Sequence, residues 1–260
     1  MPAIGYLKCG KEKRNFIIPE FGPLAGLRVI GAGSLIAMPF AATMMADFGA
    51  EVIQIERPKI GDTYRSFPPL KKTEQGTAGS SWMQDARNLS MTLELDLNDP
   101  DVKEIFFRLI ERSDIFIENM VWLDKLGIHD SELLKINHRL VIVHVSGYGH
   151  KEFGGLPEIC DQASYDMTSQ AYSGYALFNG YPDRDPLIVK PSLGDYITAL
   201  FALFGMLSAH ISAKNTGRGQ VVDVSQFEAQ ARVMRDAFTM SSLGLAEVQR
   251  CGTKAIGFQP

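Results

Sequence analysis

Short runs of β-branched and aliphatic residues alternate with helical patterns along most of the 260-residue chain. The predicted strands are 27–33, 51–56, 90–96, 114–119, 140–149 and the first part of 219–238. The predicted helices are 39–49, 99–113, 130–139 and the second part of 219–238. Nearly continuous apolar strands that alternate with helices are typical of a parallel sheet covered on both faces. The sequence therefore predicts a Rossmann-like α/β fold, with ligand sites in the loops after the carboxyl ends of the strands.

Two stretches break this alternation. Residues 58–89 are rich in Gly, Pro and polar residues, and we expect them to form a long loop. Residues 150–194 are aromatic and glycine-rich and show little clear periodicity. The sequence assigns no regular element to either stretch.

A second feature is the run 196–213, eighteen residues without Lys, Arg, Asp or Glu. It lies at the short limit for a membrane span and includes Thr198 and His210. No second span is found elsewhere in the sequence, so we expect a buried core helix and no membrane contact.

Asp195 directly precedes this run. Aspartate is a favoured N-cap, and the helix dipole with its free N–H groups should keep such a carboxylate ionised. An ionised carboxylate beside an apolar core can also attack an activated acyl group. On position alone, capping is the preferred interpretation.

The composition, 45% hydrophobic and 22% charged, is that of a soluble globular protein. A net charge of -4 gives no reason to expect nucleic acid or an anionic membrane as a partner. Cys9, Cys160 and Cys251 are far apart, which favours a reduced, cytoplasmic compartment. No histidine pair has the spacing of a zinc protease, so we expect no metal, and we expect His144 and His210 to be core residues.

The glycines of Gly31-Ala32-Gly33 leave the first predicted strand and suggest dinucleotide binding, with Glu56 as the ribose-binding acid. The third glycine of that fingerprint is replaced by Ile36, so an NAD enzyme is a minor alternative. Neither a phosphate-binding P-loop nor a G-x-S-x-G elbow is present in the sequence.

Several segments together resemble the class III coenzyme A transferases, which include the formyl-CoA:oxalate, carnitine and bile-acid enzymes. The matching segments are "FGPLAGLRVI", "ADFGAEVIQIERPKIGD", "SMTLELDL", "DIFIEN", "LVIVHVSGYG" and "TGRGQVVDVSQFEA". They occur in the family's order from Phe21 onward, and they lean towards the carnitine and bile-acid branch. The resemblance implies the Rossmann-like large domain of such a transferase.

The resemblance also implies a mechanism and a ligand. Asp195 occupies the position of the aspartate that attacks the acyl-CoA thioester and passes CoA to a small carboxylic acid through anhydride and thioester intermediates. Gly147 and Gly149 are expected to supply backbone donors for the oxyanion. The positions implied to bind coenzyme A are Ile36, Ala37, Arg57, Leu95, Asp96, Asn119, Lys125, Ser146, Gly147 and Tyr148.

The resemblance further implies the domain organisation. Residues 1–20 would be an N-terminal extension, 21–235 the CoA-binding large domain, and 236–260 a linker towards a small domain that is absent from this chain. Family members form interlocked homodimers. Many also carry "ENFRPG" where this chain has "ENMVWLDKLG", and the missing arginine and glycine argue against ordinary CoA affinity.

Related α-methylacyl-CoA racemases use a histidine just before an aspartate as a base. Here Tyr165 precedes Asp166, which favours a transferase because a phenol is a poor base near neutral pH. Aromatic packing of Tyr165 against 171–178 is the alternative role for this side chain. A racemase, or an inactive CoA-binding or partner-binding remnant, remains the alternative function.

Overall fold

Six strands form one parallel sheet in the order β5-β2-β1-β6-β7-β8. The computed structural model describes residues 21–74, 76–86, 91–120, 123–245 and 249–254. The strands are β1 (Arg28–Ala32), β2 (Glu51–Glu56), β5 (Met91–Glu94), β6 (Ile115–Glu118), β7 (Val141–Ser146) and β8 (Gln220–Ser225). All six correspond to predicted strands. The order reverses beside β1, because β2 pairs on one side of it and β6 on the other.

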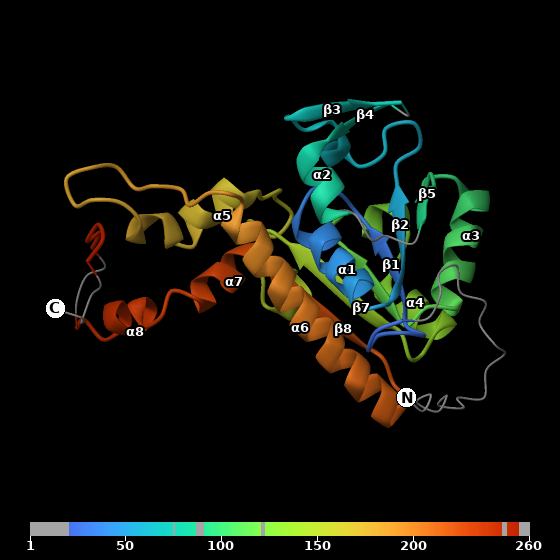
Figure 1. Cartoon of the computed structure of the whole chain (residues 1–260). Helices are drawn as coiled ribbons and strands as arrows, with labels where there is room; N and C mark the ends of the chain where they lie inside the picture. The colour runs from blue at the N-terminus through green and yellow to red at the C-terminus, as the bar shows by residue number, and fades with distance from the viewer. Residues whose placement is uncertain (1–20, 75, 87–90, 121–122, 246–248, 255–260) are drawn as a thin grey trace, which may run out of the picture.

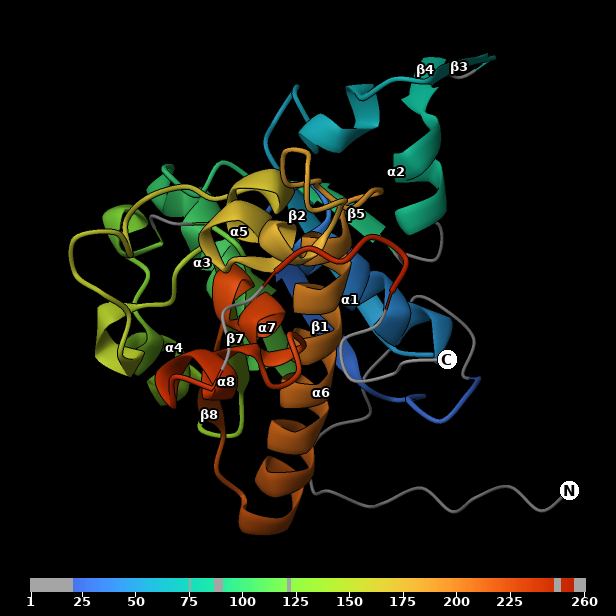
Figure 2. The same cartoon turned by 90° about the vertical axis from the view of Figure 1, so that its left-hand side faces the viewer.

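Helices cover both faces of the sheet, as predicted (Figures 1 and 2). On one face α1 (Ala37–Asp47) and α6 (Leu193–Thr216) share an apolar cluster with side chains such as Val29 and Val143. On the other face, side chains of α3 (Pro100–Glu111) and α4 (Asp130–Ile136) pack against Ile30 and Phe116. The Rossmann-like architecture is therefore confirmed.

The stretch 58–89 is more ordered than the sequence indicates. Its described part contains a 3-10 helix η1 (Thr63–Ser66), an antiparallel hairpin of β3 (Leu70–Thr73) and β4 (Gly76–Gly79), and α2 (Ser80–Asp85). The hairpin projects away from the main sheet, and its strands read LKKT and GTAG, so no alternating apolar pattern marks it (Figure 1). The predicted loop is thus wrong for most of this stretch.

Short elements also fill the second irregular stretch, namely η3 (Lys151–Phe153), α5 (Asp166–Tyr172) and η4 (Tyr175–Phe178). The remaining short elements are η2 (Asp124–Leu126), α8 (Ala237–Ser242) and α7 (Gln226–Arg232), which corresponds to the helix predicted in the second part of 219–238. The predicted extension 1–20 lies outside the described residues, and α8 lies within the predicted linker 236–260. The predicted domain limits stay a prediction.

Helix α6 differs from its prediction in two ways. It begins at Leu193 with Ser192 as N-cap, so Asp195 is its third residue and not a cap.

By length and composition α6 is the one described helix that could cross a membrane. One face packs on β7, β8 and α1, whereas Leu200, Phe204 and Ile211 on the opposite side are exposed. The expected full burial is therefore wrong, because the sheet and α1 cover a single face.

Met206 and Phe204 offer a matched test of this half-burial. Met206 is fully buried against the sheet, whereas Phe204 is 73% exposed. We expect Met206→Ala to lower the free energy of unfolding by about 2–5 kcal/mol through a cavity. Phe204→Ala should change it by less than about 1 kcal/mol. Urea unfolding followed by circular dichroism measures both, and equal losses would contradict the placement of this helix.

Candidate active site

The predicted ligand-binding positions lie at the carboxyl edge of the sheet, where sites of doubly wound folds are found. Ile36 and Ala37 follow β1, Arg57 follows β2, and Asn119 follows β6. Because all these strands are parallel, their carboxyl ends open on the same side. The fold thus gathers these predicted positions along one edge.

Asn119 clasps the turn after β1 at the point where the strand order reverses. The backbone N–H of Ser34 donates to Asn119 Oδ1 at 3.0 Å, and Asn119 Nδ2 donates to the carbonyl of Ser34 at 2.8 Å. Gly33 has a φ of +148°, and a Cβ there would lie 1.8 Å from Asn119 Oδ1. Only glycine fits this close approach, so the glycine that suggested dinucleotide binding is required by the contact with Asn119.

Ile36 and Ala37 are buried at the start of α1, Ile36 as N-cap and Ala37 as first helical residue. Their apolar side chains are buried, so what these positions could offer a ligand is their backbone. The helix start itself can favour a phosphate through its N–H groups.

Glu56 is committed to a network within the protein and does not face a ribose. Its carboxylate accepts from Arg65 at 2.8 and 2.6 Å and from the backbone N–H of Asp62 at 2.9 Å. The guanidinium of Arg65 in turn lies 3.7 Å over the ring of Trp82. The acid expected for an NAD enzyme is therefore occupied, whereas the neighbouring Arg57 is exposed.

Leu95 and Asp96 follow β5, which ends at Glu94, instead of ending the strand as predicted. The Leu95 N–H donates to the Glu56 carbonyl at 3.1 Å, and the Leu95 side chain packs into the core. Asp96 is exposed and accepts twice from Asn98, which lowers the pKa of its carboxyl. Lys125 is exposed within η2.

The turn after β7 is held by its own polar groups. The N–H of Gly149 donates to Ser146 Oγ at 2.8 Å, and the carbonyl of Gly147 accepts from the N–H of Phe227 at 3.2 Å. The predicted strand to residue 149 therefore ends at Ser146. Because the Gly149 N–H already has an acceptor, its predicted role as an oxyanion donor is not supported in this conformation.

Tyr148, another predicted CoA contact, is buried. Its ring centroid lies 5.0 Å from that of Tyr172 and 6.2 Å from that of Phe227. The side chain thus belongs to an aromatic cluster that joins the turn to α5 and α7.

Asp195 lies in the first turn of α6, and its Oδ1 accepts a hydrogen bond from Gln226 Nε2 at the start of α7. Burial raises the pKa of Asp195 to about 7, and the negative charge of Asp166 adds to the rise, while Gln226 opposes it. The carboxyl is therefore only partly ionised at neutral pH, whereas the sequence led us to expect full ionisation at the helix start. Loss of hydration and the charge of a second carboxylate raise its pKa.

The second carboxylate, Asp166, is buried and well satisfied. It accepts from Gln170 Nε2 at 2.9 and 3.0 Å and from the N–H of Gly194 at 2.8 Å. Gln230 packs so closely that a Cβ on Gly194 would lie 2.5 Å from its Nε2. Asp166 thus anchors the start of α6, one residue before Asp195.

Tyr196, the residue after Asp195, holds the start of α6 through two contacts. Its hydroxyl donates to Asp85 Oδ2 at 2.9 Å, and its ring contacts Phe40 edge-on with centroids 4.8 Å apart. Asp85 ends α2, which the sequence did not predict. Sequence reasoning missed Gln226, Gln170 and Asp85 because their pairing with the α6 start spans distant segments, and no local spacing signals it.

Tyr165 is 60% exposed as N-cap of α5, so the alternative role, packing against 171–178, does not bury it. No side-chain partner that would make it a base accompanies it in the contacts described for this helix start.

Known proteins resemble this chain over most of its length. The sequence profile of CoA-transferase family III matches residues 24–260. Over 227 residues the chain is 41% identical to the bile acid CoA-transferase BaiK of Clostridium scindens. Over 219 residues it is 35% identical to the succinyl-CoA–L-malate CoA-transferase alpha subunit of Chloroflexus aurantiacus. These alignments cover 86% and 82% of the chain but 48% of each relative, so the chain spans about half of their length.

Solved structures show the same fold. A CaiB/BaiF family protein from Brucella suis superposes with a TM-score of 0.83 at 27% identity, covering 92% of this chain and 62% of that one. A protein from M. tuberculosis superposes with a TM-score of 0.75 at 22% identity, covering 86% and 61%. The parallel sheet and its helices are thus shared with these proteins.

The raised pKa of Asp195 predicts a pH dependence of stability. The folded carboxyl releases its proton near pH 7 and the unfolded one near 3.8. The folded state therefore holds more protons across that window, and the free energy of unfolding falls as the pH rises through it. Asp195→Asn removes this part of the fall, because an amide does not titrate. We expect the variant to gain stability over the wild type between about pH 5 and about pH 8.

Urea unfolding at the two pH values measures this gain. Asp183→Asn, an exposed change outside the site, is the control and should follow the wild type. If Asp195→Asn follows the wild type as well, the carboxyl is not protonated in the folded protein.

Proposed function

The chain belongs to CoA-transferase family III, and from that premise we propose that it moves coenzyme A between an acyl-CoA thioester and a carboxylic acid, with Asp195 as the nucleophile. One observation supports this role above others. The Asp195 carboxylate is oriented by Gln226, which directly follows β8 at the carboxyl edge of the sheet. The relatives' activity comes to this chain as part of the proposal, because the chain spans about half of their length.

In the proposed first step, Asp195 attacks the carbonyl carbon of the acyl-CoA thioester. A C–O bond forms between Asp195 and the acyl group, and the C–S bond breaks. The CoA thiolate is released, and a mixed anhydride remains on the aspartate. The thiolate then attacks the aspartyl carbonyl, releases the acyl carboxylate and gives an aspartyl-CoA thioester. An acceptor carboxylate then attacks the aspartyl-CoA carbonyl and expels the CoA thiolate, which leaves a second mixed anhydride. The thiolate attacks the acceptor's carbonyl in this anhydride, which gives the acceptor's CoA thioester and the free Asp195 carboxylate.

The surroundings of Asp195 suit this chemistry. A carboxylate with a pKa of about 7 is more basic than an ordinary one and is still ionised in part at neutral pH. Limited hydration also removes water that would compete as a nucleophile. The Gln226 amide fixes the direction of Oδ1, so the carboxylate needs little reordering before attack.

The carboxyl edge is the proposed place for coenzyme A. The backbone at Ile36 and Ala37, the exposed Arg57, and Lys125 in η2 would hold its phosphates. Asn119 would shape the crevice through its clasp on Ser34. The proposed CoA-binding domain is 21–235.

The remaining proposals concern the setting of the protein. Its substrates would be an acyl-CoA and a small carboxylic acid, as the names of the two relatives suggest. A homodimer in the cytoplasm is proposed, as the resemblance to the family implies.

The nucleophile can be tested by steady-state kinetics. Asp195→Asn removes the attacking oxygen while keeping a similar shape, so we expect the rate of CoA transfer to fall roughly 10³-fold or more. The assay follows CoA thioesters by chromatography, with succinyl-CoA and L-malate or a bile-acid CoA pair as substrates. Asp183→Asn is the control and should keep the wild-type rate.

Three outcomes would contradict the proposal. Full CoA transfer by Asp195→Asn would exclude this nucleophile. Incorporation of solvent deuterium at the α-carbon of an acyl-CoA, without transfer, would indicate a racemase. CoA binding without any turnover by the wild type would indicate an inactive remnant.

A further inference from the structure

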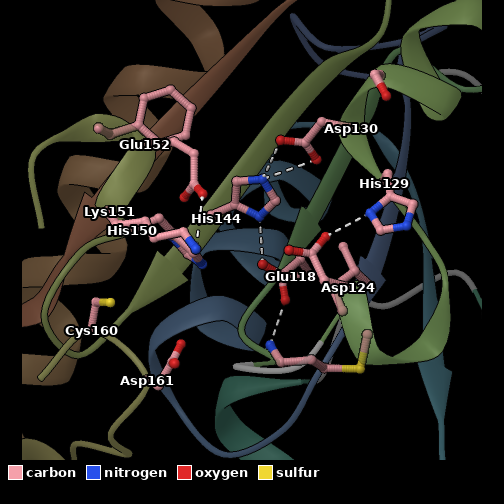
Figure 3. A pocket seen from close by; sticks show the side chains of 14 residues that line it. Glu118, Asp124, His129, Asp130, His144, His150, Lys151, Glu152, Cys160 and Asp161 are labelled. Carbon is pink, nitrogen blue, oxygen red and sulfur yellow. Dashed lines mark hydrogen bonds and ion pairs between the residues drawn. The ribbon is translucent and has the colours of Figure 1, made fainter. Parts of the chain in front are cut away.

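A cavity of about 290 Å³ opens at the carboxyl ends of β6 and β7, beside α4 (Figure 3). Its lining carries five acidic side chains, three histidines and a single lysine. Glu118 ends β6, His144 lies on β7, and His150 follows the turn after β7. The proposed mechanism uses none of these three side chains.

His144 and His150 each place one ring nitrogen within hydrogen-bond distance of a carboxylate other than Glu118. His144 Nε2 lies 3.0 and 3.1 Å from the oxygens of Asp130, and His150 Nδ1 lies 2.6 Å from Asp223 Oδ1. Asp223 also accepts the backbone N–H of His150 at 3.0 Å, which fixes its loop. An imidazole that donates to a carboxylate on one side presents its other nitrogen as a ligand.

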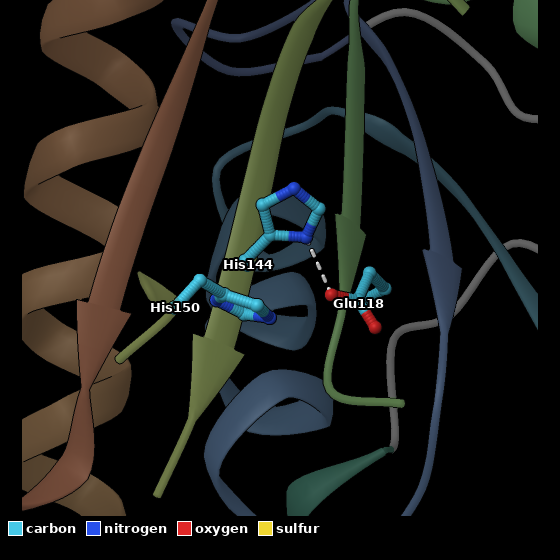
Figure 4. Close-up of side chains that lie close together, drawn as sticks. All are labelled: Glu118, His144 and His150. Atoms are coloured by element: carbon cyan, nitrogen blue, oxygen red, sulfur yellow. Dashed lines mark hydrogen bonds and ion pairs between the residues drawn. The ribbon is translucent and has the colours of Figure 1, made fainter. Parts of the chain in front are cut away.

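Glu118, His144 and His150 lie close together, with His144 Nδ1 facing the Glu118 carboxylate (Figure 4). Glu118 Oε1 lies 2.6 Å from His144 Nδ1, and the rings of His144 and His150 have centroids 5.0 Å apart. One ligand atom from each of the three side chains falls within 4.8 Å of the other two. Ligands of tetrahedral zinc are separated by roughly 3.4 Å, as follows from bonds of about 2.0–2.2 Å, so shifts of roughly 1 Å complete the geometry.

We infer that Glu118, His144 and His150 form a binding site for a divalent transition-metal ion, with zinc as the preferred ion. Two neutral imidazoles and one carboxylate are a ligand set that zinc accepts and that magnesium or calcium does not favour. Asp130 and Asp223 are the outer carboxylates that orient the imidazoles.

The charge of the cluster supports a cation. Glu118, Asp130 and Asp223 bring three carboxylates against two imidazoles in a mostly buried place. These carboxylates pair with the two imidazoles in the structure, and a divalent ion bound in place of imidazole protons would offset most of the same negative charge. This inference departs from the expectation of no metal, which rested on histidine spacing along the chain and could not show residues 118, 144 and 150 meeting in space.

A bound ion would have a structural consequence. It would tie the end of β6 to His150, which follows directly after Gly149 in the turn held by Ser146. The ion would therefore stiffen the turn whose Gly147 carbonyl is bonded to α7, beside Gln226. It would bind whether or not the chain transfers CoA.

The test is metal binding by the chelator-treated, full 260-residue chain. Isothermal titration with zinc chloride should show one ion per chain, and magnesium should not compete. Glu118→Gln and His150→Gln each remove a ligand and should weaken zinc binding by roughly 100-fold or more. Asp223→Asn removes an outer carboxylate and should weaken it by roughly 10–100-fold.

His129→Gln is the matched control. His129 lines the same cavity and pairs with Asp124 at 3.0 Å, but it is outside the proposed ligand set and exposed. This variant should bind zinc as the wild type does. Circular dichroism of the metal-free variants checks that they fold.

Cobalt(II) gives a second readout on the wild type alone, because nitrogen ligation changes its visible spectrum. The inference is overturned if the wild type binds neither zinc nor cobalt, which would mean that protons balance the carboxylates. It is also overturned if zinc affinity is unchanged in Glu118→Gln and His150→Gln, or is lost in His129→Gln.

Discussion

The in-register parallel pairing of β7 with β8 determines where the candidate site lies. Ser146 pairs with Ser225, so the turn after β7 and the start of α7 leave the sheet side by side. The bond from the Phe227 N–H to the Gly147 carbonyl joins them, and the preceding residue, Gln226, reaches Asp195. The β7–β8 pairing thus positions Gln226, and Gln226 in turn orients Asp195 on α6, a helix that precedes β8 in the chain. This register therefore places Gln226 within reach of Asp195.

The site depends on an electrostatic imbalance between two carboxylates. Asp166 is satisfied by Gln170 and the Gly194 N–H, whereas Asp195 has Gln226 as its described hydrogen-bond donor. Desolvation and the charge of Asp166 therefore act on Asp195, whose pKa rises to about 7. Such a shift costs stability above neutral pH and is typical of reactive groups. The raised pKa suits the proposed function, because a more basic carboxylate is a better nucleophile.

The periodic part of the fold could be predicted from the sequence, and the non-local part could not. Strands rich in β-branched and aliphatic residues, such as 51–56 and 140–146, carry their own signal, because a parallel strand buried on both faces favours such residues. The position of Asp195 near a helix start was also readable. Its Gln226 partner, the β3–β4 hairpin and the convergence of Glu118 with His144 and His150 depend on contacts between distant segments. Likewise, the apolar composition of α6 could not show that the sheet covers only one of its faces.

The most direct test of the central claim is to locate the covalent intermediate. The wild-type chain is incubated with an acyl-CoA, quenched with hydroxylamine, and mapped by peptide mass spectrometry. An activated aspartyl carbonyl would be converted to a hydroxamate, and we predict this modification at Asp195 and only in the presence of acyl-CoA. An unmodified Asp195, or modification at Asp166 instead, would contradict the assignment of Asp195 as the acyl-accepting nucleophile.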